Sequence, residues 1–417
     1  MNQPNILVCG NHTCGNRGDA AIMRGLLNGL AAEHPDANIT VTSRYPTSSA
    51  YILKRPVVAD IFSGSDIVAP GRRQATRRRM VPWSLLMRSR REGRYYGPML
   101  PKGVRDRINH LRNYDLVVQL GGSYFIDLYG YGHFETGFAA MAADVPLILV
   151  GHSMGPVHRG KYPIMMRHLL SHATYVGLRE TVSQEILEQA KMPMGRVDIG
   201  SDSAWNISPA GVDSVDPRRD IFKDPERPIV AITARMLAPF DALLNVSQAQ
   251  YEAAFAHLVE ALIAAGYNVL ALSTCTGIDS YHRDDRMVGL RIGDRLESAA
   301  HYHVLMDEID DLMLGAYLRA CDLLVATRLH SAIIAMNFGT PAIALAYEHK
   351  STGILRDMQL SELSAGIDEL IDGRLIPRAL SAAAERQTLA ERIRPAVEKA
   401  RERAHGLIAS GLRAAGF

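Results

Sequence analysis

Apolar positions along the first half of the chain fall into short continuous runs that alternate with segments of helical periodicity. Strand-like runs cover residues 6–9, 39–42, 115–120, 146–151, 175–178 and 196–199. Residues 19–33 instead repeat apolar side chains with the spacing of an amphipathic helix. Buried strands separated by helices are typical of a parallel sheet that helices cover on both faces.

The pattern stops once and then restarts. Residues 208–228 are rich in Pro, Asp and Arg, lack periodicity and are typical of a linker. Beyond them, strand-like runs cover 229–233, 268–273, 302–306, 322–326 and 341–345, and helical patterns cover 247–265, 309–319 and 330–337. An Ala- and Arg-rich tail from about 379 to 412 is also helical in pattern.

Two such alternations predict an α/β protein with two doubly wound, Rossmann-like lobes in a GT-B-like arrangement and a long C-terminal helix. We expect an N-terminal lobe over 1–210, a linker over 211–228, a C-terminal lobe over 229–375 and a helical tail over 376–417. Ligands of such folds bind beyond the carboxyl ends of the strands, so the cleft between the lobes is the expected site.

Composition narrows the class of protein. No apolar run in the 417 residues approaches the roughly 20 residues of a transmembrane helix, and the first residues do not resemble a secretory signal. We therefore expect a cytoplasmic protein. The four cysteines, at 9, 14, 275 and 321, form no CxxC pair, which indicates free thiols. Cys9 and Cys14 lie near His12 without a second ligand cluster, so no metal is expected.

Charge is distributed unevenly. Residues 72–112 hold thirteen Lys or Arg against Glu92 and Asp106, a net charge of +11. Such a block favours a polyanionic partner. The aromatic residues in it follow no RNA-binding signature, so nucleic acid is not expected. Two interpretations stay open: a solvated insertion, or peripheral contact with the plasma membrane through Val81, Trp83, Leu85, Leu86 and Met87.

Three positions just after strands of the C-terminal lobe can bind an anion. Arg235 follows the run 229–233, the sequence Thr327–Ser331 follows 322–326, and Tyr347–Lys350 follows 341–345. Arginine presents a planar fork that grips carboxylate or phosphate at two points. A helix that begins near Ser331 would add free N–H groups. His330 can exchange a proton near neutral pH. Each residue alone could be a surface ion pair or a cap, but their clustering favours an anion site.

The N-terminal lobe offers weaker candidates. The Gly-rich turn over residues 10–19 matches neither G-x-G-x-x-G nor the Walker pattern, so no nucleotide cofactor is expected. Each candidate has a structural explanation beside a ligand-binding one; Asp19, for example, could simply cap a helix. The candidates for contact with a ligand in this lobe are Asn16, Asp19, Gly121, Gly122, Asp127 and His152.

Taken together, these motifs resemble the polysaccharide pyruvyl transferase family, and most closely its colanic acid type. The similarity covers nearly the whole chain to about residue 360, while the block 72–112 and the tail match poorly. The strings that carry it are GNHTCGNRGDAAI, GGSYFIDLYG, GHSMGP, ALSTCTGIDSY and TRLHSAIIAMNFGTPAIALAYEHKSTGI.

The resemblance implies transfer of pyruvate from phosphoenolpyruvate to a hexose of a bacterial exopolysaccharide repeat unit, with a ketal as product. It also implies an acceptor oligosaccharide, which we expect to be lipid-linked at the inner face of the plasma membrane, and no cofactor beyond the co-substrate. Arg235, Arg328 and His330 match the donor-binding and catalytic positions, and Lys350 matches a recurrent lysine. Ser331 is a further donor-side candidate. The alternative is a glycosyltransferase that uses a nucleotide sugar, with Glu348 on the ribose.

Overall fold

The computed structural model describes residues 3–61, 72–89, 100, 102–238, 241–279, 283–346 and 349–417, without the side chains of 72–79, 243 and 349–351. The chain forms two compact units. Unit 1 comprises Met1–Thr13, Ile22–Asn206 and Arg401–Phe417, and unit 2 comprises Cys14–Ala21 and Ile207–Ala400.

Unit 1 contains a parallel sheet of seven strands in the order β3-β2-β1-β4-β5-β6-β7. The order reverses between β1 and β4, as in a doubly wound sheet. The strands are β1 (Asn5–Asn11), β2 (Asn38–Ser43), β3 (Val58–Ala59), β4 (Leu116–Phe125), β5 (Leu147–Met154), β6 (Tyr175–Leu178) and β7 (Val197–Ile199).

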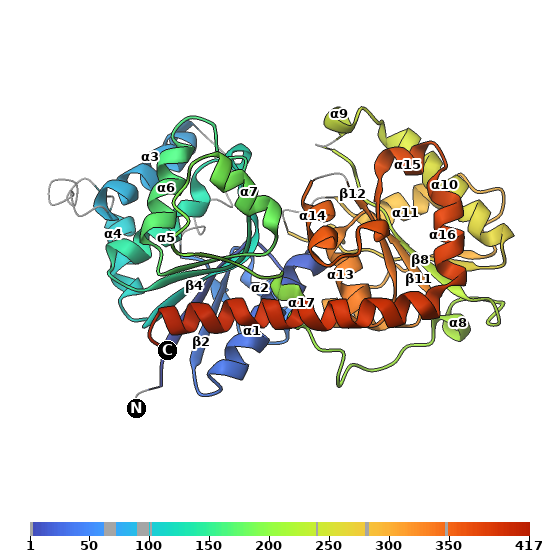
Figure 1. The fold of residues 1–417 in the computed structure, drawn as a ribbon, viewed down its shortest axis with the longest axis horizontal. Helices are drawn as coiled ribbons and strands as arrows, with labels where there is room; N and C mark the ends of the chain where they lie inside the picture. Colours follow the sequence, from blue (N-terminus) through green and yellow to red (C-terminus); the bar gives the residue numbers. More distant parts are fainter. Residues whose placement is uncertain are drawn as a thin grey trace. The chain divides into compact units, whose positions relative to one another are not determined.

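The central strands of unit 1 are buried on both faces because helices pack on each side (Figure 1). Strands β4 and β5 approach closely at Gly121, where a Cβ atom would lie 2.3 Å from the Gly151 carbonyl oxygen. The helices are α1 (Arg17–Glu33), α2 (Pro46–Leu53), α3 (Arg72–Ser89), α4 (Lys102–Leu111), α5 (Glu135–Ala142), α6 (Tyr162–His172) and α7 (Thr181–Gln189).

Part of the basic block lies in helix α3, and three of its aliphatic residues are not available to a membrane. Val81, Leu85 and Leu86 are buried in the core of unit 1. The ammonium of Lys161 lies 3.9 Å from the ring centroid of Trp83, in a cation–π contact. The interpretation that Val81, Leu85 and Leu86 contact a membrane is therefore wrong. Residues 90–99 and 101 lie outside the described residues.

Unit 2 repeats the same topology with six parallel strands in the order β10-β9-β8-β11-β12-β13. The strands are β8 (Ile229–Thr233), β9 (Asn268–Ala271), β10 (Tyr302–Val304), β11 (Leu323–Ala326), β12 (Ala342–Ala346) and β13 (Ser364–Gly366). The longer helices around it are α10 (Gln248–Ala264), α11 (Asp285–Gly293), α12 (Asp311–Arg319), α13 (Leu329–Asn337), α14 (His349–Asp357) and α16 (Leu375–Ala384). Its core joins side chains of the sheet to those of α10, α11, α15 (Ile367–Ile371) and α16.

The boundary between the two units falls within helix α1 and within helix α17. At both places the units differ from the domain boundaries expected from the sequence. Residues 14–21, including the first turn of α1, belong to unit 2 rather than to the N-terminal lobe. The reason is local, because the backbone N–H of Arg17 donates to the Thr274 carbonyl at 2.8 Å. Helix α17 (Arg386–Ala414) begins in unit 2, and its residues from Arg401 belong to unit 1.

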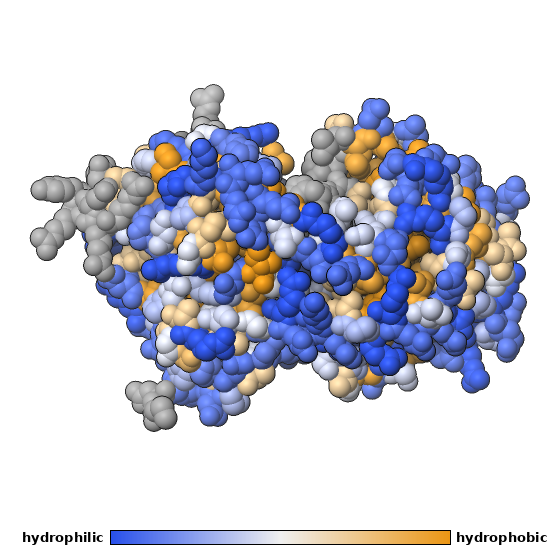
Figure 2. Space-filling view, in the orientation of Figure 1, coloured by the Kyte–Doolittle hydropathy of each residue, from blue (hydrophilic) through white to orange (hydrophobic). Residues whose placement is uncertain are grey.

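The α/β class with two doubly wound units of the predicted GT-B-like fold is confirmed by these sheets. The tail is helical as predicted, but it is divided into α16 and α17 at Glu385. Figure 2 shows both hydrophilic and hydrophobic residues on the visible face of each unit, with the hydrophilic ones in the majority. Within the part of the chain that is described, no helix is both long and apolar enough to cross a membrane.

Candidate functional site

The candidate donor site lies at the point where the strand order of unit 2 reverses. Strands β8 and β11 are neighbours, with Thr233 paired to Ala326. Arg235 follows β8 by two residues and Arg328 follows β11 by two residues. Both arginines therefore leave the carboxyl edge of the sheet at its switch point, where ligands of doubly wound sheets bind.

Two hydrogen-bonded pairs hold these neighbouring strand ends together. The hydroxyl of Tyr251, on helix α10, lies 2.7 Å from Thr327 Oγ1 and accepts from the Arg235 backbone N–H at 3.2 Å. Thr233 and Ser331 place their hydroxyl oxygens 2.8 Å apart. Because the Tyr251 hydroxyl contacts the residues after both strands, and the Thr233–Ser331 pair joins β8 to the start of α13, the backbones that carry the two arginines are fixed relative to each other.

A buried carboxylate orients the guanidinium of Arg328. Asp285, the first residue of α11, accepts from Arg328 Nη2 at 2.8 Å and from Nε at 3.0 Å. The Asp285 side chain is 1% exposed and that of Arg328 is 14% exposed. Asp285 Oδ2 also accepts from the Cys275 N–H at 3.2 Å. This two-point geometry fixes the plane of the guanidinium as well as its position.

His330 packs against residues 14–21, which we call the N-terminal arm. A Cβ atom built on Gly18 would lie 2.7 Å from Cβ, Cγ and Nδ1 of His330. Only glycine leaves room for the imidazole in this arrangement. Gly18 thus forms one wall of the position that His330 occupies in unit 2.

Arg17 anchors the N-terminal arm in unit 2. Its side chain is fully buried and forms an ion pair with Glu308. The guanidinium also donates to Thr276 Oγ1 at 3.2 Å and to the Ile309 carbonyl. Next to it, Asn16 forms an antiparallel bridge with Cys275. The sequence places Arg17 beside Asp19 but gives no sign that it reaches residues almost 300 positions away.

The Cys275 thiol is buried at this site. Burial raises its pKa to about 12; Arg328 and Arg235 lower it, and Asp285 and Asp19 raise it. The thiol itself is protonated at neutral pH, which excludes it as a thiolate nucleophile.

Of the remaining donor-side candidates, the structure describes the side chain of Ser331 but not that of Lys350. The hydroxyl of Ser331 is buried and bonds to Thr233 and, at 2.6 Å, to the Arg328 carbonyl oxygen, so its role in the structure is to join the strand ends. Lys350 lies in the first turn of α14, and its side chain is outside the described residues. Glu348 also lies outside them.

The structure separates the six candidates of the N-terminal lobe. Asn16 and Asp19 belong to unit 2, on the N-terminal arm beside His330. Gly121 and Gly122 lie within strand β4 rather than in a turn after it. The other two side chains have structural contacts in unit 1.

Asp127 and His152 are those two residues. One carboxylate oxygen of Asp127 accepts from the backbone N–H groups of His158 and Arg159, at 2.9 and 3.1 Å, and so closes a loop. His152 is fully buried in β5 and lies 3.2 Å from the Gln119 carbonyl oxygen. Burial lowers the pKa of His152 to about 3, so this imidazole is neutral and belongs to the core.

A buried ionic network in unit 1 was also missed by sequence reasoning. Arg179 donates to Asp202 at 2.5 Å, to Ser153 at 2.7 Å and to Ser123 at 2.8 Å, and it pairs with Glu180 at 3.2 Å. It stands directly after β6, in the position where a binding arginine would also stand. Its partners, of which Asp202, Ser153 and Ser123 are distant in the sequence, show that its role is structural.

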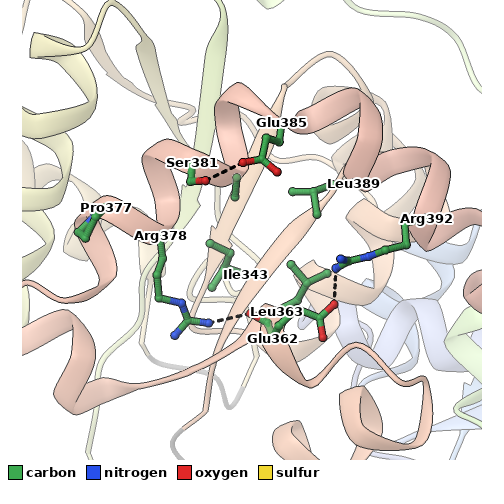
Figure 3. Close-up of a pocket in the computed structure, with 10 residues that line it drawn as sticks. Ile343, Glu362, Leu363, Pro377, Arg378, Ser381, Glu385, Leu389 and Arg392 are labelled. Carbon is green, nitrogen blue, oxygen red and sulfur yellow. Dashed lines mark hydrogen bonds and ion pairs between the residues drawn. The ribbon is translucent and has the colours of Figure 1, made fainter.

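A separate cavity of about 400 Å³ lies in unit 2 between α16, the start of α17 and β12 (Figure 3). Its two arginines are bound within the chain: Arg378 to Glu369, and Arg392 to Glu362. The lining residue Ile343 lies in the amino-terminal half of β12, whereas the donor site is at the carboxyl edge. The described residues hold no group of three or more His, Cys, Asp or Glu that could bind a metal ion.

Comparisons with known proteins agree with this arrangement. The chain is 39% identical over 420 residues to amylovoran biosynthesis protein AmsJ of Erwinia amylovora, covering 99% of this chain and all of that protein. Among solved structures, it is similar to Anabaena Alr3699/HepE in complex with UDP and glucose (TM-score 0.60, 15% identity, 99% and 100% coverage of the two chains).

A second similar structure is UDP-GlcNAc 2-epimerase from Neisseria meningitidis bound to UDP-GlcNAc (TM-score 0.60, 12% identity, 98% and 99% coverage). At this identity, both structures support the fold alone. The sequence profile of the family described as polysaccharide pyruvyl transferase matches residues 16–349, which include residues 16–21 of the N-terminal arm, Arg235, Arg328 and His330. The chain therefore belongs to the polysaccharide pyruvyl transferase family.

Proposed function

We propose that the protein transfers pyruvate from phosphoenolpyruvate to a hexose of an exopolysaccharide repeat unit, forms a cyclic ketal and releases phosphate. The observation that supports this donor is the pair of arginines, Arg235 and Arg328, at the switch point of unit 2 beside His330. Phosphoenolpyruvate carries a carboxylate and a phosphate on one carbon, C2, so two fixed guanidinium groups match its two anionic groups.

The chemistry needs one acid and two hydroxyl groups. His330, as an imidazolium, donates a proton to C3 of phosphoenolpyruvate, which becomes a methyl group while C2 becomes electrophilic. A sugar hydroxyl adds to C2 and loses its proton. A second hydroxyl of the same sugar then displaces phosphate from C2 and also loses its proton, which closes the ketal. The arginines stabilise the charge on the departing phosphate. Lys350 is proposed to assist them.

The proposal can be tested by measuring both products of the reaction, phosphate and the ketal. We expect phosphate release from phosphoenolpyruvate to depend on an acceptor, for which repeat-unit oligosaccharide freed of its pyruvate by mild acid is suitable. Each phosphate should be matched by one ketal, detected by its methyl signal in NMR. Phosphate release without a ketal, or no release at all, would contradict the proposal.

Variants separate the roles of the three residues. His330→Ala should lower turnover about 10²- to 10⁴-fold, the usual contribution of a general acid, and largely preserve donor affinity. Arg235→Ala and Arg328→Gln should instead raise the KM for phosphoenolpyruvate steeply. Glutamine is preferable at 328 because alanine would leave the buried Asp285 carboxylate without a hydrogen-bond donor from this position. Unchanged kinetics in any variant would remove that residue from the site.

The alternative function, transfer of a glycosyl group from a nucleotide sugar, is favoured by the fold that the chain shares with proteins solved with UDP or a UDP-sugar. The two functions differ in their products. Nucleotide release from a UDP-sugar in the presence of acceptor would support the alternative, and phosphate release from phosphoenolpyruvate would support ours.

The acceptor is proposed to be lipid-linked at the inner face of the plasma membrane. Val81, Leu85 and Leu86 of α3 are buried, so the test of peripheral contact is directed at the charges of the block. Lys102, Arg105 and Arg112 are exposed on or just after α4 and are suitable for charge reversal, since deletion of α3 would remove Val81 and Leu85 from the core. Unchanged sedimentation of the triple variant with anionic liposomes would count against membrane contact through this block.

A further inference from the structure

We infer that Asp285 is a positioning residue for donor binding: it sets the orientation in which Arg328 meets phosphoenolpyruvate and links that arginine to the N-terminal arm. The inference rests on the proposed function, because it takes Arg328 as a donor ligand. Asp285 itself does not need to touch the donor.

Asp285 binds one edge of the Arg328 guanidinium and so fixes its orientation. Its carboxylate binds Nε and Nη2 of Arg328, at 3.0 and 2.8 Å. A guanidinium has a second two-donor edge, formed by Nη1 and Nη2, which suits a carboxylate or a phosphate. An arginine whose first edge is fixed presents the second edge in one direction and loses less side-chain entropy when an anion binds.

The same carboxylate is bound to the loop that carries the N-terminal arm. Asp285 Oδ2 accepts from the Cys275 N–H at 3.2 Å, and the Asp285 N–H donates to the Cys275 carbonyl at 2.9 Å. Cys275 pairs with Asn16, two residues before Gly18, which packs against His330. The buried Asp285 carboxylate therefore binds both the guanidinium of Arg328 and the loop of Cys275, which pairs with the arm that packs against His330.

Charge and geometry predict opposite results when Asp285 is changed. If the carboxylate only neutralises Arg328, its removal leaves more positive charge and phosphoenolpyruvate binds more tightly. If it positions Arg328, its removal weakens binding. Asp285→Asn removes the charge at nearly constant shape, whereas Asp285→Glu keeps the charge and moves the carboxylate by one methylene group. The two variants together distinguish the explanations.

Asp322 provides a matched control within the same unit. It is also a buried carboxylate that binds two arginines, Arg218 at 3.0 Å and Arg386 at 2.8 Å. It stands directly before β11, whereas Arg328 follows the same strand. Asp322→Asn therefore removes a comparable buried ion pair at the amino edge of the sheet, away from the donor site.

The experiment is titration calorimetry of phosphoenolpyruvate with the full-length protein and its variants. We expect Asp285→Asn and Asp285→Glu each to raise the donor Kd about ten- to a hundredfold, the range seen when outer partners of metal ligands are removed. Asp322→Asn should keep the wild-type Kd. In an Arg328→Gln background, Asp285→Asn should add little, since the positioned group is already absent.

Three results would overturn the inference. The first is tighter or unchanged binding in Asp285→Asn. The second is a wild-type Kd in Asp285→Glu. The third is an equal loss on Asp285→Asn with and without Arg328. If Asp285→Asn does not fold, the Kd for phosphoenolpyruvate is measured instead for Asp285→Glu, alone and in the Arg328→Gln background. The same comparison then tests the inference. Failure of the wild-type protein to bind phosphoenolpyruvate would instead contradict the proposed donor, which keeps the two failures distinct.

Discussion

Replacement of Gly18 by alanine is the most direct test of the contact between the N-terminal arm and His330. The added Cβ would lie 2.7 Å from three atoms of His330, about 1 Å closer than carbon atoms normally approach. One of the three is the Cβ of the histidine, which rotation about its side-chain bonds cannot move. Helix α13 or the arm must therefore shift, and the imidazole shifts with it.

The expected effect on stability is small and the effect on turnover is large. Alanine is favoured over glycine in a helix by about 1 kcal/mol, whereas overpacking costs about 1–3 kcal/mol. The net loss for Gly18→Ala is then at most about 2 kcal/mol, and the variant should fold. A catalytic group misplaced by about 1 Å can cost about a hundredfold in rate. We therefore expect a hundredfold lower kcat in a protein with a nearly normal melting temperature.

The assay is acceptor-dependent phosphate release at saturating phosphoenolpyruvate and acceptor, with melting followed by circular dichroism. Gly406→Ala is the matched control, because Gly406 lies inside helix α17 and no heavy atom beyond its own helix and chain neighbours lies within 4 Å of an added Cβ. It should raise stability by up to about 1 kcal/mol and preserve turnover. Wild-type turnover in Gly18→Ala would refute the conclusion that the arm positions His330.

Three further predictions concern the buried charges and the core. Arg179→Met should lower the free energy of unfolding by about 3–5 kcal/mol in urea titrations, because two buried carboxylates lose their counter-charge; a loss below 1 kcal/mol would contradict this. Burial lowers the pKa of His152 to about 3, so the unfolded chain binds a proton near pH 6.5 that the folded chain does not bind. The free energy of unfolding is then unaffected by this group above pH 6.5 and falls by about 1.4 kcal/mol per pH unit below it. In His152→Gln, the free energy of unfolding should fall less steeply in this acid range, by that amount. Arg17→Met should destabilise unit 2 by about 3 kcal/mol and increase proteolysis in the arm, and an unchanged cleavage rate would argue against the anchor.

The sequence predicted the elements well where burial is continuous. The runs at 175–178 and 229–233 coincide with β6 and β8, because fully buried parallel strands consist of uninterrupted apolar residues. Strands β3 and β13 were missed. The first has two residues, and the second is Ser364–Gly366, too short and too polar for a strand pattern. Pairing with neighbouring strands, and not their own sequence, determines that these two segments form strands.

The site was predictable only in part, for a related reason. Residues that follow neighbouring strands, such as Arg235 and Arg328, can be placed together from topology alone. Asp285 cannot, because its partner is 43 positions away and no motif joins them. The apolar run predicts a strand that ends at residue 151, before His152, but β5 continues to Met154 and buries the ring. The extent of a strand decides whether a polar residue near its end faces a ligand or the core.

The two units show how the same residue type after a buried strand acquires different roles. Arg179 and Arg328 both follow a strand of a doubly wound sheet. In unit 1, Arg179 is 2% exposed, and its Nε, Nη1 and Nη2 all donate to side chains of that unit. A ligand would have to displace those bonds and expose two buried carboxylates, which is costly.

In unit 2, Nε and Nη2 of Arg328 share a single carboxylate, and the side chain is 14% exposed. This arrangement fixes the guanidinium on one side without enclosing it, which is what an anion-binding arginine requires. The same argument favours unit 2 over unit 1 for the proposed donor site, although both sheets are doubly wound. The distinction lies in how far each side chain is enclosed, 2% exposed for Arg179 and 14% for Arg328, and the enclosing residues come from segments that the sequence alone does not bring together.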